Sequence, residues 1–499
     1  MAGADFDLCV IGAGATGLGA ARAAAAAGRR VALVEAERPG GDCTHYGCVP
    51  SKALLESARR VQAARSGADY GFRADVEVDF AAVMERVAAV IATIERDESP
   101  RLLARQKIEL ISGHGRFTSP GSIDVDGARV TARRFVLASG SHAVPPAVPG
   151  IETVEVLDNR SVFGLREQPD HLVVLGGGPV GVELAQAFRR LGSRVTVVEA
   201  APRLLPREEP EASQAVTGVL VREGVVVRTG VSVDRIGKDP ATQGPVLHLA
   251  DGAAVAGSHL LVAAGRRPST DGLGLQAAGV RVDERGRVLT DAYLRAAQTV
   301  WAAGDCTSPL QFTHVGDEQG RLAARNAFAP TLRRARWSDR VVPWAIFTEP
   351  EVGHVGLTED AAVQRYGGRV RVSLVRDATM DRARMAGQTD GLVKLIALPG
   401  RVGGMALGRL VGMTAVGPMA GEQIAEGALA MRSGVLVGRL AQTIHAYPTW
   451  SLSTRIAAAR FFGSHGGSAA RPGRRETRPA GPGNAAGPGD AAGPGDAAT

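Results

Sequence analysis

Cysteine and lysine are both scarce in this sequence. Its 499 residues include only four cysteines and four lysines, so the formal net charge of +7 comes almost wholly from arginine. An arginine excess of this kind is weak evidence for nucleic-acid binding, and we expect no nucleic-acid partner. A chain this long buries a large core without covalent help, so the few cysteines favour a reducing compartment, the cytoplasm.

Long apolar runs are also missing. No charge-free apolar stretch of about 18 residues occurs, so we expect no segment to cross a membrane. We expect no targeting segment either, because Asp5 and Asp7 open the chain and its first apolar run is broken by glycines. With 45% hydrophobic and 22% charged residues, the composition is typical of a soluble globular chain of three or four domains.

Glycine, by contrast, is abundant, and it recurs in two matching units. A buried strand over residues 6–11 runs into a turn that contains Gly12, Gly14 and Gly17. A second strand over residues 171–175 runs into a turn that contains Gly176, Gly178 and Gly181. Each turn is followed by a helix, another strand and an acid, which is Glu35 in the first unit and Glu199 in the second. The second set of glycines and its acid lie 164 positions after the first.

This spacing is typical of dinucleotide-binding units. The first glycine permits a tight turn, the second lets backbone amides approach a pyrophosphate, and the third lets the helix pack on the strand. The helix N-terminus then holds the phosphates, and the acid accepts hydrogen bonds from ribose hydroxyls. A single glycine turn would be weak evidence, but two in matching contexts predict an α/β protein with two such domains.

A pair of cysteines follows the first unit. Cys43 and Cys48 stand five positions apart, directly before a helical run. Their loop can close a disulfide if the backbone coils enough to bring the Cα atoms within about 7 Å. Pro50 suits the first turn of a helix, which places Cys48 near a helix N-terminus, where the dipole favours a thiolate. We interpret the pair as a redox-active disulfide rather than as a structural bridge.

Together these residues resemble the flavin-dependent pyridine nucleotide–disulfide oxidoreductases, over roughly residues 5–462. The resemblance implies an α/β fold with two Rossmann-like dinucleotide-binding domains, for FAD and NAD, plus an α+β C-terminal dimerisation domain. The expected domains are FAD-binding residues 1–150, NAD-binding residues 151–270, a second FAD-binding part over 271–336 and a dimerisation domain over 337–462. A Gly/Pro/Ala-rich tail over 463–499 is expected to be disordered. The implied assembly is a homodimer.

The resemblance also implies roles for single residues. Cys48 would face the flavin, Cys43 would exchange with the substrate, and Lys52 would pair with Glu183 near the reactive edge of the flavin. FAD would be bound by Gly12, Gly14, Gly17, Glu35, Lys52, Gly115, Ser139, Gly140 and Asp305. The nicotinamide cofactor would be bound by Gly176, Gly178, Gly181, Glu199 and Gly265. Glu199 favours NADH over NADPH because a carboxylate repels a 2′-phosphate, although Arg203 and Arg207 lie close enough in sequence to soften that preference.

The chain departs from the family near its C-terminus. Members that reduce disulfides carry a His-Pro-Thr-x-x-Glu segment whose histidine is the acid/base for the thiol. Here Tyr447 stands at the histidine position and Leu452 at the glutamate position. A phenol of pKa near 10 is a poor base at neutral pH. His445, two residues earlier, either substitutes for the missing imidazole or is structural, and both alternatives stay open.

These observations predict an enzyme. It would pass two electrons from NADH through FAD to the Cys43–Cys48 disulfide and on to a disulfide or related small-molecule acceptor, as dihydrolipoamide dehydrogenases do. The alternative is a flavin reductase of quinones or metal ions, similar to mercuric reductase, with the disulfide accessory. We expect no resident metal. A binding protein on a degenerate fold is disfavoured because both nucleotide motifs and the cysteine pair are intact.

Overall fold

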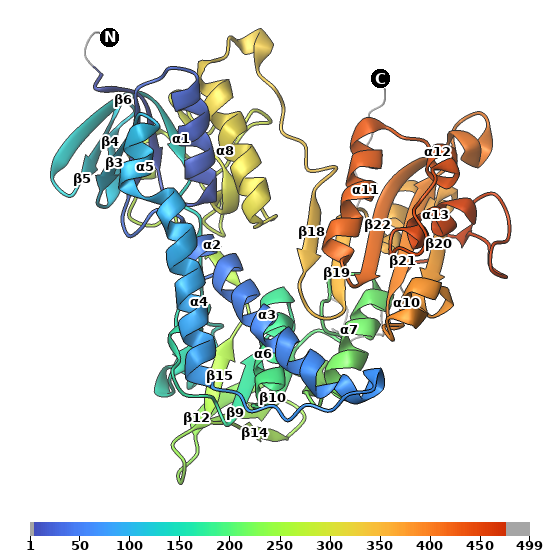
Figure 1. The fold of residues 1–499 in the computed structure, drawn as a ribbon. Helices are drawn as coiled ribbons and strands as arrows, with labels where there is room; N and C mark the ends of the chain where they lie inside the picture. The colour runs from blue at the N-terminus through green and yellow to red at the C-terminus, as the bar shows by residue number, and fades with distance from the viewer. Residues whose placement is uncertain (1–3, 476–499) are drawn as a thin grey trace, which may run out of the picture.

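The computed structural model describes residues 4–475, which fold into three sheet-based domains (Figure 1). The sheet of the first domain has the order β3-β2-β1-β6-β5-β4, and β17 pairs with β6. Its strands are β1 (Phe6–Ile11), β2 (Val31–Glu35), β3 (Ile108–Ser112), β4 (Gly115–Ser119), β5 (Ser122–Val125), β6 (Ala128–Leu137) and β17 (Val300–Ala302). The first domain is therefore built from two segments of the chain.

Parallel pairing and burial explain why the central strands are apolar runs. β1 pairs in parallel with β2 and β6, and its residues from Leu8 to Val10 are fully buried. Helices α1 (Ala15–Ala26) and α8 (Thr313–Phe328) lie side by side against this sheet (Figure 1). They approach closely because their contact is made of small residues, and a Cβ on Gly320 would lie 2.1 Å from the Thr16 carbonyl oxygen.

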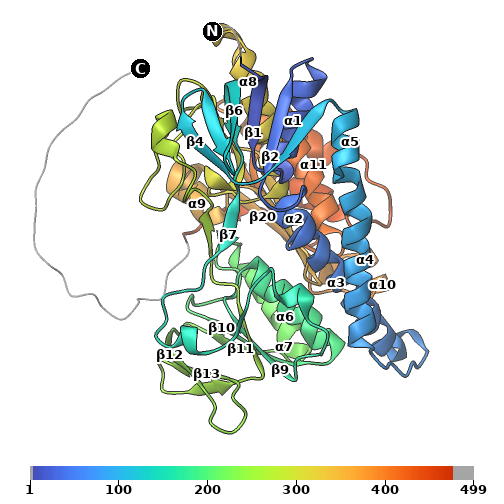
Figure 2. The ribbon, with the colours of Figure 1, turned by 90° about the vertical axis from the view of Figure 1, so that its left-hand side faces the viewer.

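The second domain is inserted between β7 (Ser141–Ala143) and β16 (Arg266–Pro268), which pair with each other. Its parallel sheet has the order β11-β10-β9-β15-β8. The strands are β8 (Val156–Leu157), β9 (His171–Leu175), β10 (Arg194–Glu199), β11 (Val226–Thr229) and β15 (His259–Val262). Helices α6 (Pro179–Leu191) and α7 (Pro210–Arg222) lie on one side, and the small sheet of β12 (Val233–Lys238), β13 (Pro245–Leu249) and β14 (Ala254–Ala256) on the other (Figure 2).

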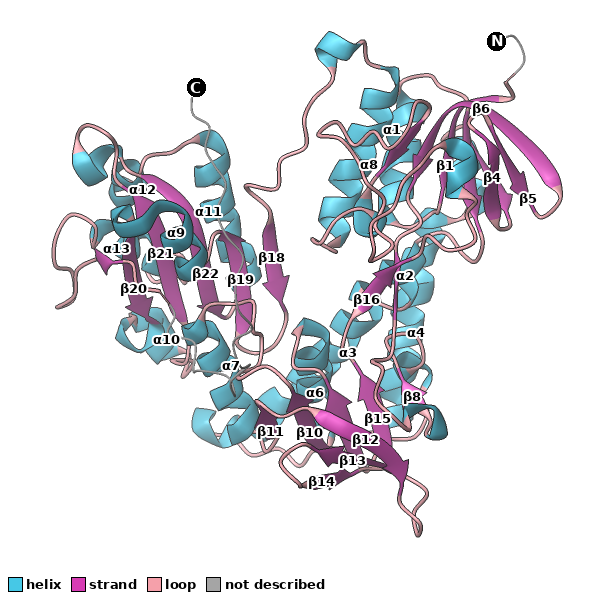
Figure 3. Cartoon of the chain, turned by 180° about the vertical axis from the view of Figure 1, so that it is seen from behind, coloured by secondary structure: helices cyan, strands magenta, loops and turns pink. Residues whose placement is uncertain are grey.

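The third domain is an antiparallel sheet of order β18-β19-β22-β21-β20-β23 with helices packed on it (Figure 3). The strands are β18 (Pro343–Ile346), β19 (Glu351–Gly356), β20 (Arg371–Arg376), β21 (Leu392–Leu398), β22 (Arg409–Gly417) and β23 (Arg471–Pro472). Among its helices, α11 (Ala420–Ser433) packs on β19 and β22, and α13 (Leu452–Ala459) packs on β20 and β21. The whole is the predicted combination of two Rossmann-like domains and an α+β domain. Within residues 4–475, no helix is both long and apolar enough to span a membrane.

The start of the predicted disordered tail at residue 463 is wrong. Residues 463–475 continue the third domain, because β23 pairs with β20 and extends the sheet. Arg471 forms an ion pair with Glu359, and its Nη2 lies 2.8 Å from Glu359 Oε2. A two-residue strand held by charge and backbone hydrogen bonds needs no apolar run, so composition did not indicate it. The rest of the predicted tail, residues 476–499, lies outside the described part of the chain.

A buried charge cluster joins the second and third domains. Lys394 on β21 is 2% exposed, and its Nζ lies 2.8 Å from Glu209, 2.9 Å from Glu211 and 2.8 Å from Glu359. Glu209 and Glu211 come from the start of α7, whereas Glu359 begins α9 (Glu359–Tyr366) in the third domain. Breaking such a pair leaves an uncompensated buried charge, so the cluster fixes how the two domains meet.

Candidate active site

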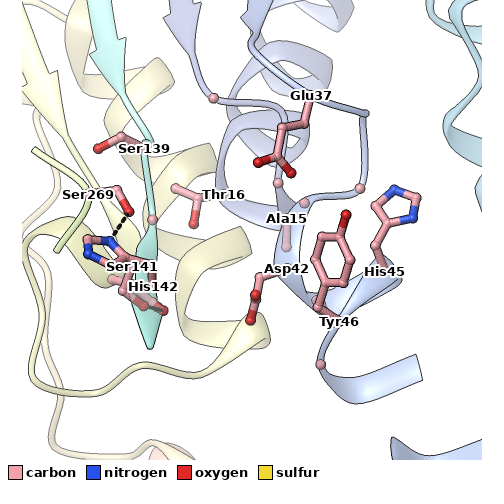
Figure 4. Close-up of a pocket in the computed structure, with 18 of the residues that line it drawn as sticks. Ala15, Thr16, Glu37, Asp42, His45, Tyr46, Ser139, Ser141, His142 and Ser269 are labelled. Atoms are coloured by element: carbon pink, nitrogen blue, oxygen red, sulfur yellow. Dashed lines mark hydrogen bonds between the residues drawn. The ribbon is translucent and has the colours of Figure 1, made fainter. Parts of the chain in front are cut away.

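A cavity of about 580 Å³ lies where the first two domains meet. Its walls include the glycine turn after β1, the loop with both cysteines, and the first residues of α6 and α8. Ser139 and Ser141 lie on one side of the cavity and Asp42 and Tyr46 on the other, with Thr16 between them (Figure 4). A cavity of this size is typical of a site for a cofactor or another small molecule.

The two glycine turns have the same geometry, and only one glycine in each is left open. A Cβ on Gly17 would lie 1.7 Å from the Gly12 carbonyl oxygen, and one on Gly181 would lie 1.9 Å from that of Gly176. By contrast, a Cβ on Gly14 would meet only the Cα of Gly41 at 3.8 Å, and a Cβ on Gly178 would meet nothing within 4 Å. The outer glycines are therefore required by the fold, whereas Gly14 and Gly178 leave space for a ligand.

The two acids are also equivalent. Glu35 Oε2 accepts the Ala13 N–H at 2.6 Å, and Glu199 Oε2 accepts the Gly177 N–H at 2.6 Å. The second oxygen of each carboxylate accepts a backbone N–H two residues further on. A carboxylate has about four acceptor positions, so each still has capacity for ribose hydroxyls. The 164-residue repeat in the sequence thus extends to individual hydrogen bonds.

The residues that the first domain contributes to the cavity fit FAD. Ser139 Oγ is buried without a hydrogen-bond partner among the described residues, and its side chain lines the cavity. Gly115 lines the cavity at the start of β4. Asp305 Oδ2 accepts the Ser141 hydroxyl at 2.7 Å, and burial raises the pKa of this carboxyl group. The orphaned Ser139 hydroxyl, the open space at Gly14 and the buried Asp305 carboxylate lie along one cavity, and a polar, hydroxyl-rich cofactor would satisfy them.

The cysteine pair lies at the junction of two helices in the same cavity. Cys43 is in α2 (Gly41–His45), and Cys48 is the first residue of α3 (Cys48–Arg65), at the helix N-terminus that Pro50 predicts. Both cysteines are free thiols in the structure. Cys48 Sγ lies 3.3 Å from the hydroxyl oxygen of Thr313, the first residue of α8. Sequence reasoning did not identify Thr313, because it lies 265 positions from Cys48.

The two thiols differ in acidity. Hydrogen bonds from Cys43 and then Thr313, together with the nearby charge of Lys52, lower the pKa of Cys48 to about 6. The hydrogen bond to Cys48 and burial raise the pKa of Cys43. These opposite shifts favour the thiolate form of Cys48 over that of Cys43.

Lys52 and Glu183 are in contact beside the pair. Lys52 Nζ lies 2.8 Å from Glu183 Oε2, and it also lies 4.6 Å from the centroid of the Phe347 ring. The other carboxylate oxygen, Glu183 Oε1, accepts the Phe347 N–H at 2.8 Å. Glu183 is buried on α6 of the second domain. It contacts Lys52 of the first domain and Phe347 of the third, so the three domains meet at this point.

The structure does not bring Tyr447 or His445 to the cavity of their own chain. Tyr447 is 65% exposed and donates its hydroxyl to Asp381 Oδ2 at 3.0 Å, which raises the pKa of the phenol. His445 Nε2 lies 2.8 Å from Glu426 Oε1, and its Nδ1 lies 3.0 Å from the Thr443 carbonyl oxygen. Both ring nitrogens of His445 are therefore engaged within its own domain.

The remaining predicted residues divide into two groups. Gly140 lines the cavity, whereas Gly265 lies between β15 and β16, outside the residues that line it. Cys306 is buried next to Asp305, and burial raises the pKa of its thiol to about 11, so it is not a reactive thiol. In the described residues, no group of three or more His, Cys, Asp or Glu side chains has the arrangement of a metal site.

Two family comparisons match nearly the whole chain. Residues 6–320 match the family described as pyridine nucleotide-disulphide oxidoreductase, and residues 342–458 match the dimerisation domain of that family. Dihydrolipoyl dehydrogenase of Thermus scotoductus is 37% identical over 89% of this chain and 95% of its own length. Mercuric reductase of Streptomyces lividans is 36% identical over 91% of this chain and 96% of its own.

Solved structures agree with this assignment. The Cu(II) complex of the HOCl-induced flavoprotein disulfide reductase RclA from Escherichia coli is 30% identical, with a TM-score of 0.80 over 91% of this chain and 99% of that one. LpdA from Mycobacterium tuberculosis is 28% identical, with a TM-score of 0.81 over the same shares. The chain therefore belongs to the pyridine nucleotide-disulphide oxidoreductase family and is an FAD-dependent oxidoreductase that couples NAD(P)H to disulfide chemistry.

Proposed function

We propose that this chain carries two electrons from NADH to the Cys43–Cys48 disulfide and then to an external disulfide. The single observation that carries the proposal is the asymmetry of the pair. Cys48 is held as a thiolate next to Lys52 and Thr313, whereas Cys43 keeps its proton. A pair of this kind has one sulfur that stores negative charge and one that exchanges with a substrate.

NADH is the proposed electron donor because Glu199 is negatively charged and the Arg203 guanidinium is hydrogen-bonded to backbone carbonyl oxygens. Glu199 stands at the ribose position of the second glycine turn and would repel a 2′-phosphate. Arg203 donates from one Nη to the carbonyl oxygens of Pro206 and Glu208, at 3.2 Å each, so it is committed to its own loop. Arg207 is exposed and is the remaining cation of this loop. We therefore assign a preference for NADH over NADPH.

FAD is the proposed resident cofactor, held by Gly12, Gly14, Glu35, Ser139 and Asp305. Bound there, FAD would supply hydride acceptance from the nicotinamide and a two-electron potential low enough to open a disulfide. Lys52 supplies a fixed positive charge there, and Glu183 keeps its ammonium in position at 2.8 Å.

The cysteines would then transfer the electron pair to the acceptor. Reduction of the disulfide breaks the S–S bond and gives the Cys48 thiolate and the Cys43 thiol, with one proton taken up. Cys43 must lose its proton to attack the acceptor and form a mixed disulfide, and the Cys48 thiolate then closes the internal disulfide and releases the second acceptor thiolate. Because its pKa is raised, Cys43 needs a base for this attack.

That base is not a free imidazole here. Tyr447 is a phenol whose pKa is raised further by Asp381, and both nitrogens of His445 are engaged. We infer that small disulfides such as lipoamide or glutathione disulfide are slow acceptors. A disulfide with acidic thiols is a better acceptor, because low-pKa thiols leave faster.

A second candidate acceptor is a thiophilic metal ion. Tyr447 in place of the histidine favours it, because a bound metal ion itself displaces the proton of a ligating thiol into solvent, so no base at position 447 is needed. Similar proteins include one named mercuric reductase and the RclA reductase, whose structure was solved as a Cu(II) complex. The chain offers Cys43 and Cys48 as soft ligands, and Cys306 is buried away from solvent.

We further propose that the enzyme works as a cytoplasmic homodimer. The dimerisation domain supports the assembly, and the exposed position of Tyr447 is the place from which a partner chain would complete the site. Four cysteines in 499 residues suit a reducing compartment.

Reduction of the purified protein by NADH tests the proposal. We expect about one FAD per chain and loss of its yellow colour on adding NADH, with two thiols appearing on titration. A Gly14→Leu variant would fill the space left by Gly14 and lose the flavin, whereas Gly121→Ala, at an exposed glycine without a left-handed φ and with nothing within 4 Å of a Cβ, serves as the control. A protein that stays colourless, or whose flavin is not reduced by NADH, would overturn the proposal.

A further inference from the structure

Three partly buried arginines surround one indole ring on the first domain. The guanidinium carbons of Arg134, Arg295 and Arg334 lie 6.0, 5.7 and 5.7 Å from the centroid of the Trp301 ring. They come from β6, from the segment that bridges to Trp301, and from the connection between α8 and β18 (Figure 1). We call Arg134, Arg295 and Arg334 the Trp301 arginine cluster.

The cluster has no carboxylate partner in the described part of the chain. Arg134 donates to the carbonyl oxygens of Ala327 and Arg133, and Arg295 to those of Ala297 and Gln298. All these acceptors are neutral. Among the described residues, Asp7 forms its ion pairs with Arg30 and Arg133, and Asp291 accepts the backbone N–H groups of Tyr293 and Arg295, so neither forms an ion pair with a guanidinium of the cluster.

The cluster is also short of acceptors. Trp301 Nε1 and Arg334 Nε are both buried without a hydrogen-bond partner among residues 4–475, and both are donors. Trp301 is 1% exposed. Burial and then the charges of Arg295 and Arg334 lower the pKa of Arg134, which places the three cations within electrostatic reach of one another. Unsatisfied buried donors in a native fold are commonly explained by an ion or water bound there.

We propose that the Trp301 arginine cluster is a binding site for a phosphate-type oxyanion. Such an anion provides several acceptor oxygens for unpaired N–H donors, and guanidinium groups bind phosphate with paired hydrogen bonds. It also compensates three neighbouring positive charges that the described chain leaves unbalanced. None of these residues lines the cofactor cavity, so the site is separate from the one that binds the nucleotides.

Anion binding to the FAD-loaded enzyme tests this proposal. The enzyme is kept saturated with NAD⁺ so that the nucleotide sites are occupied, and inorganic phosphate or tripolyphosphate replaces chloride at constant ionic strength. We expect Tm to rise with the logarithm of the anion concentration, by about 1–3 °C at ten times the dissociation constant. Calorimetric titration with tripolyphosphate gives the affinity directly, and the two probes distinguish a single phosphate site from one that takes a longer chain.

Variants decide where the anion binds. Arg334→Gln and Arg295→Gln should each weaken binding at least tenfold, whereas Arg129→Gln, an exposed position on the same strand as Arg134, should leave it unchanged. No saturable binding by the wild-type enzyme would overturn the proposal, as would equal affinity in the cluster variants. The proposal would also be overturned if Arg334→Gln lowered Tm equally in chloride and in phosphate, since Arg334 would then only stack on Trp301. None of these measurements depends on electron transfer, so the anion site can be disproved without affecting the proposed function.

Discussion

The Cys48 sulfur lies 3.3 Å from the Thr313 hydroxyl, so a residue from the start of α8 contacts the sulfur at the start of α3. The hydroxyl stabilises the thiolate by a hydrogen bond, and the helix dipoles act in the same direction. The contact joins the two separate segments of the first domain at the reactive sulfur.

Replacing Thr313 by valine should raise the pKa of Cys48. Loss of a hydrogen bond to a charged group costs about 1.5–3 kcal/mol, which corresponds to a rise of about one to two pH units from the wild-type value. The pKa is measured as the midpoint of the long-wavelength thiolate–flavin absorbance in the two-electron-reduced enzyme. Thr313→Ser keeps the hydroxyl and should keep the wild-type midpoint. An unchanged midpoint in the valine variant would show that the contact does not stabilise the thiolate.

Single cysteine variants should separate the roles of the two sulfurs. Cys43→Ser leaves the Cys48 thiolate with nothing to pair with, so the long-wavelength absorbance should be present in the oxidised enzyme at pH 8 without any reductant. Cys48→Ser should show no such absorbance in any redox state. Spectra of the two purified variants are sufficient for this test, and the opposite pattern would mean that the two roles are exchanged.

Neutralising Glu183 should slow reduction by NADH. Glu183→Gln preserves the acceptor for the Phe347 N–H but removes the charge that holds Lys52. We expect the stopped-flow rate of flavin reduction to fall about tenfold, equivalent to about 1.4 kcal/mol, with little change in Tm. Glu152→Gln, at an exposed position, is the matched control. A wild-type rate in the Glu183 variant would remove this carboxylate from the mechanism.

The charge of Glu199 should set the choice of nicotinamide cofactor. Glu199→Gln keeps an oxygen acceptor for one of the two backbone N–H groups that Glu199 accepts, while removing repulsion of a 2′-phosphate. The kcat/KM for NADPH should rise about tenfold, with a smaller change for NADH. A wild-type enzyme that uses NADPH as well as NADH would contradict the assignment and point to Arg207.

Restoring an imidazole and its carboxylate should speed the reduction of small disulfides. Tyr447→His with Leu452→Glu supplies a base together with the group that orients it. General acid–base catalysis is worth about 10²–10⁴-fold, so turnover of lipoamide or glutathione disulfide should rise measurably. Tyr447→His with Leu452→Gln matches the size of the second change without its charge and should gain less. A wild-type turnover of about 10 s⁻¹ or more with these disulfides would show that the chain already has an adequate base.

Local patterns in the sequence were sufficient for the fold class. Glycine turns and their acids act within one strand–turn–helix unit, so spacing alone predicts them, and the hydrogen bonds of Glu35 and Glu199 repeat with the same 164-residue displacement. The end of the third domain was misjudged because β23 is held by pairing with β20 and by Arg471, not by apolar residues.

Contacts between distant segments could not be predicted in the same way. Thr313 reaches Cys48 only because α8 packs on α1, and nothing near either residue in sequence indicates this contact. Asp381 and Glu426, the partners of Tyr447 and His445, were missed for the same reason. The arginines around Trp301 are individually ordinary in an arginine-rich chain, and only their convergence on one ring is informative.

The buried ammonium of Lys394 limits which domains of this protein can be exchanged in a chimaera. The inserted domain has its own sheet and helices and is an obvious candidate for grafting into another reductase to change its nucleotide preference. Its Glu209 and Glu211, however, are neutralised by a lysine of a different domain, 183 residues or more further along the chain. A graft without Lys394 would place two uncompensated carboxylates at the interface with the third domain, where they are shielded from water. Successful chimaeras should therefore exchange the inserted domain and β21 together.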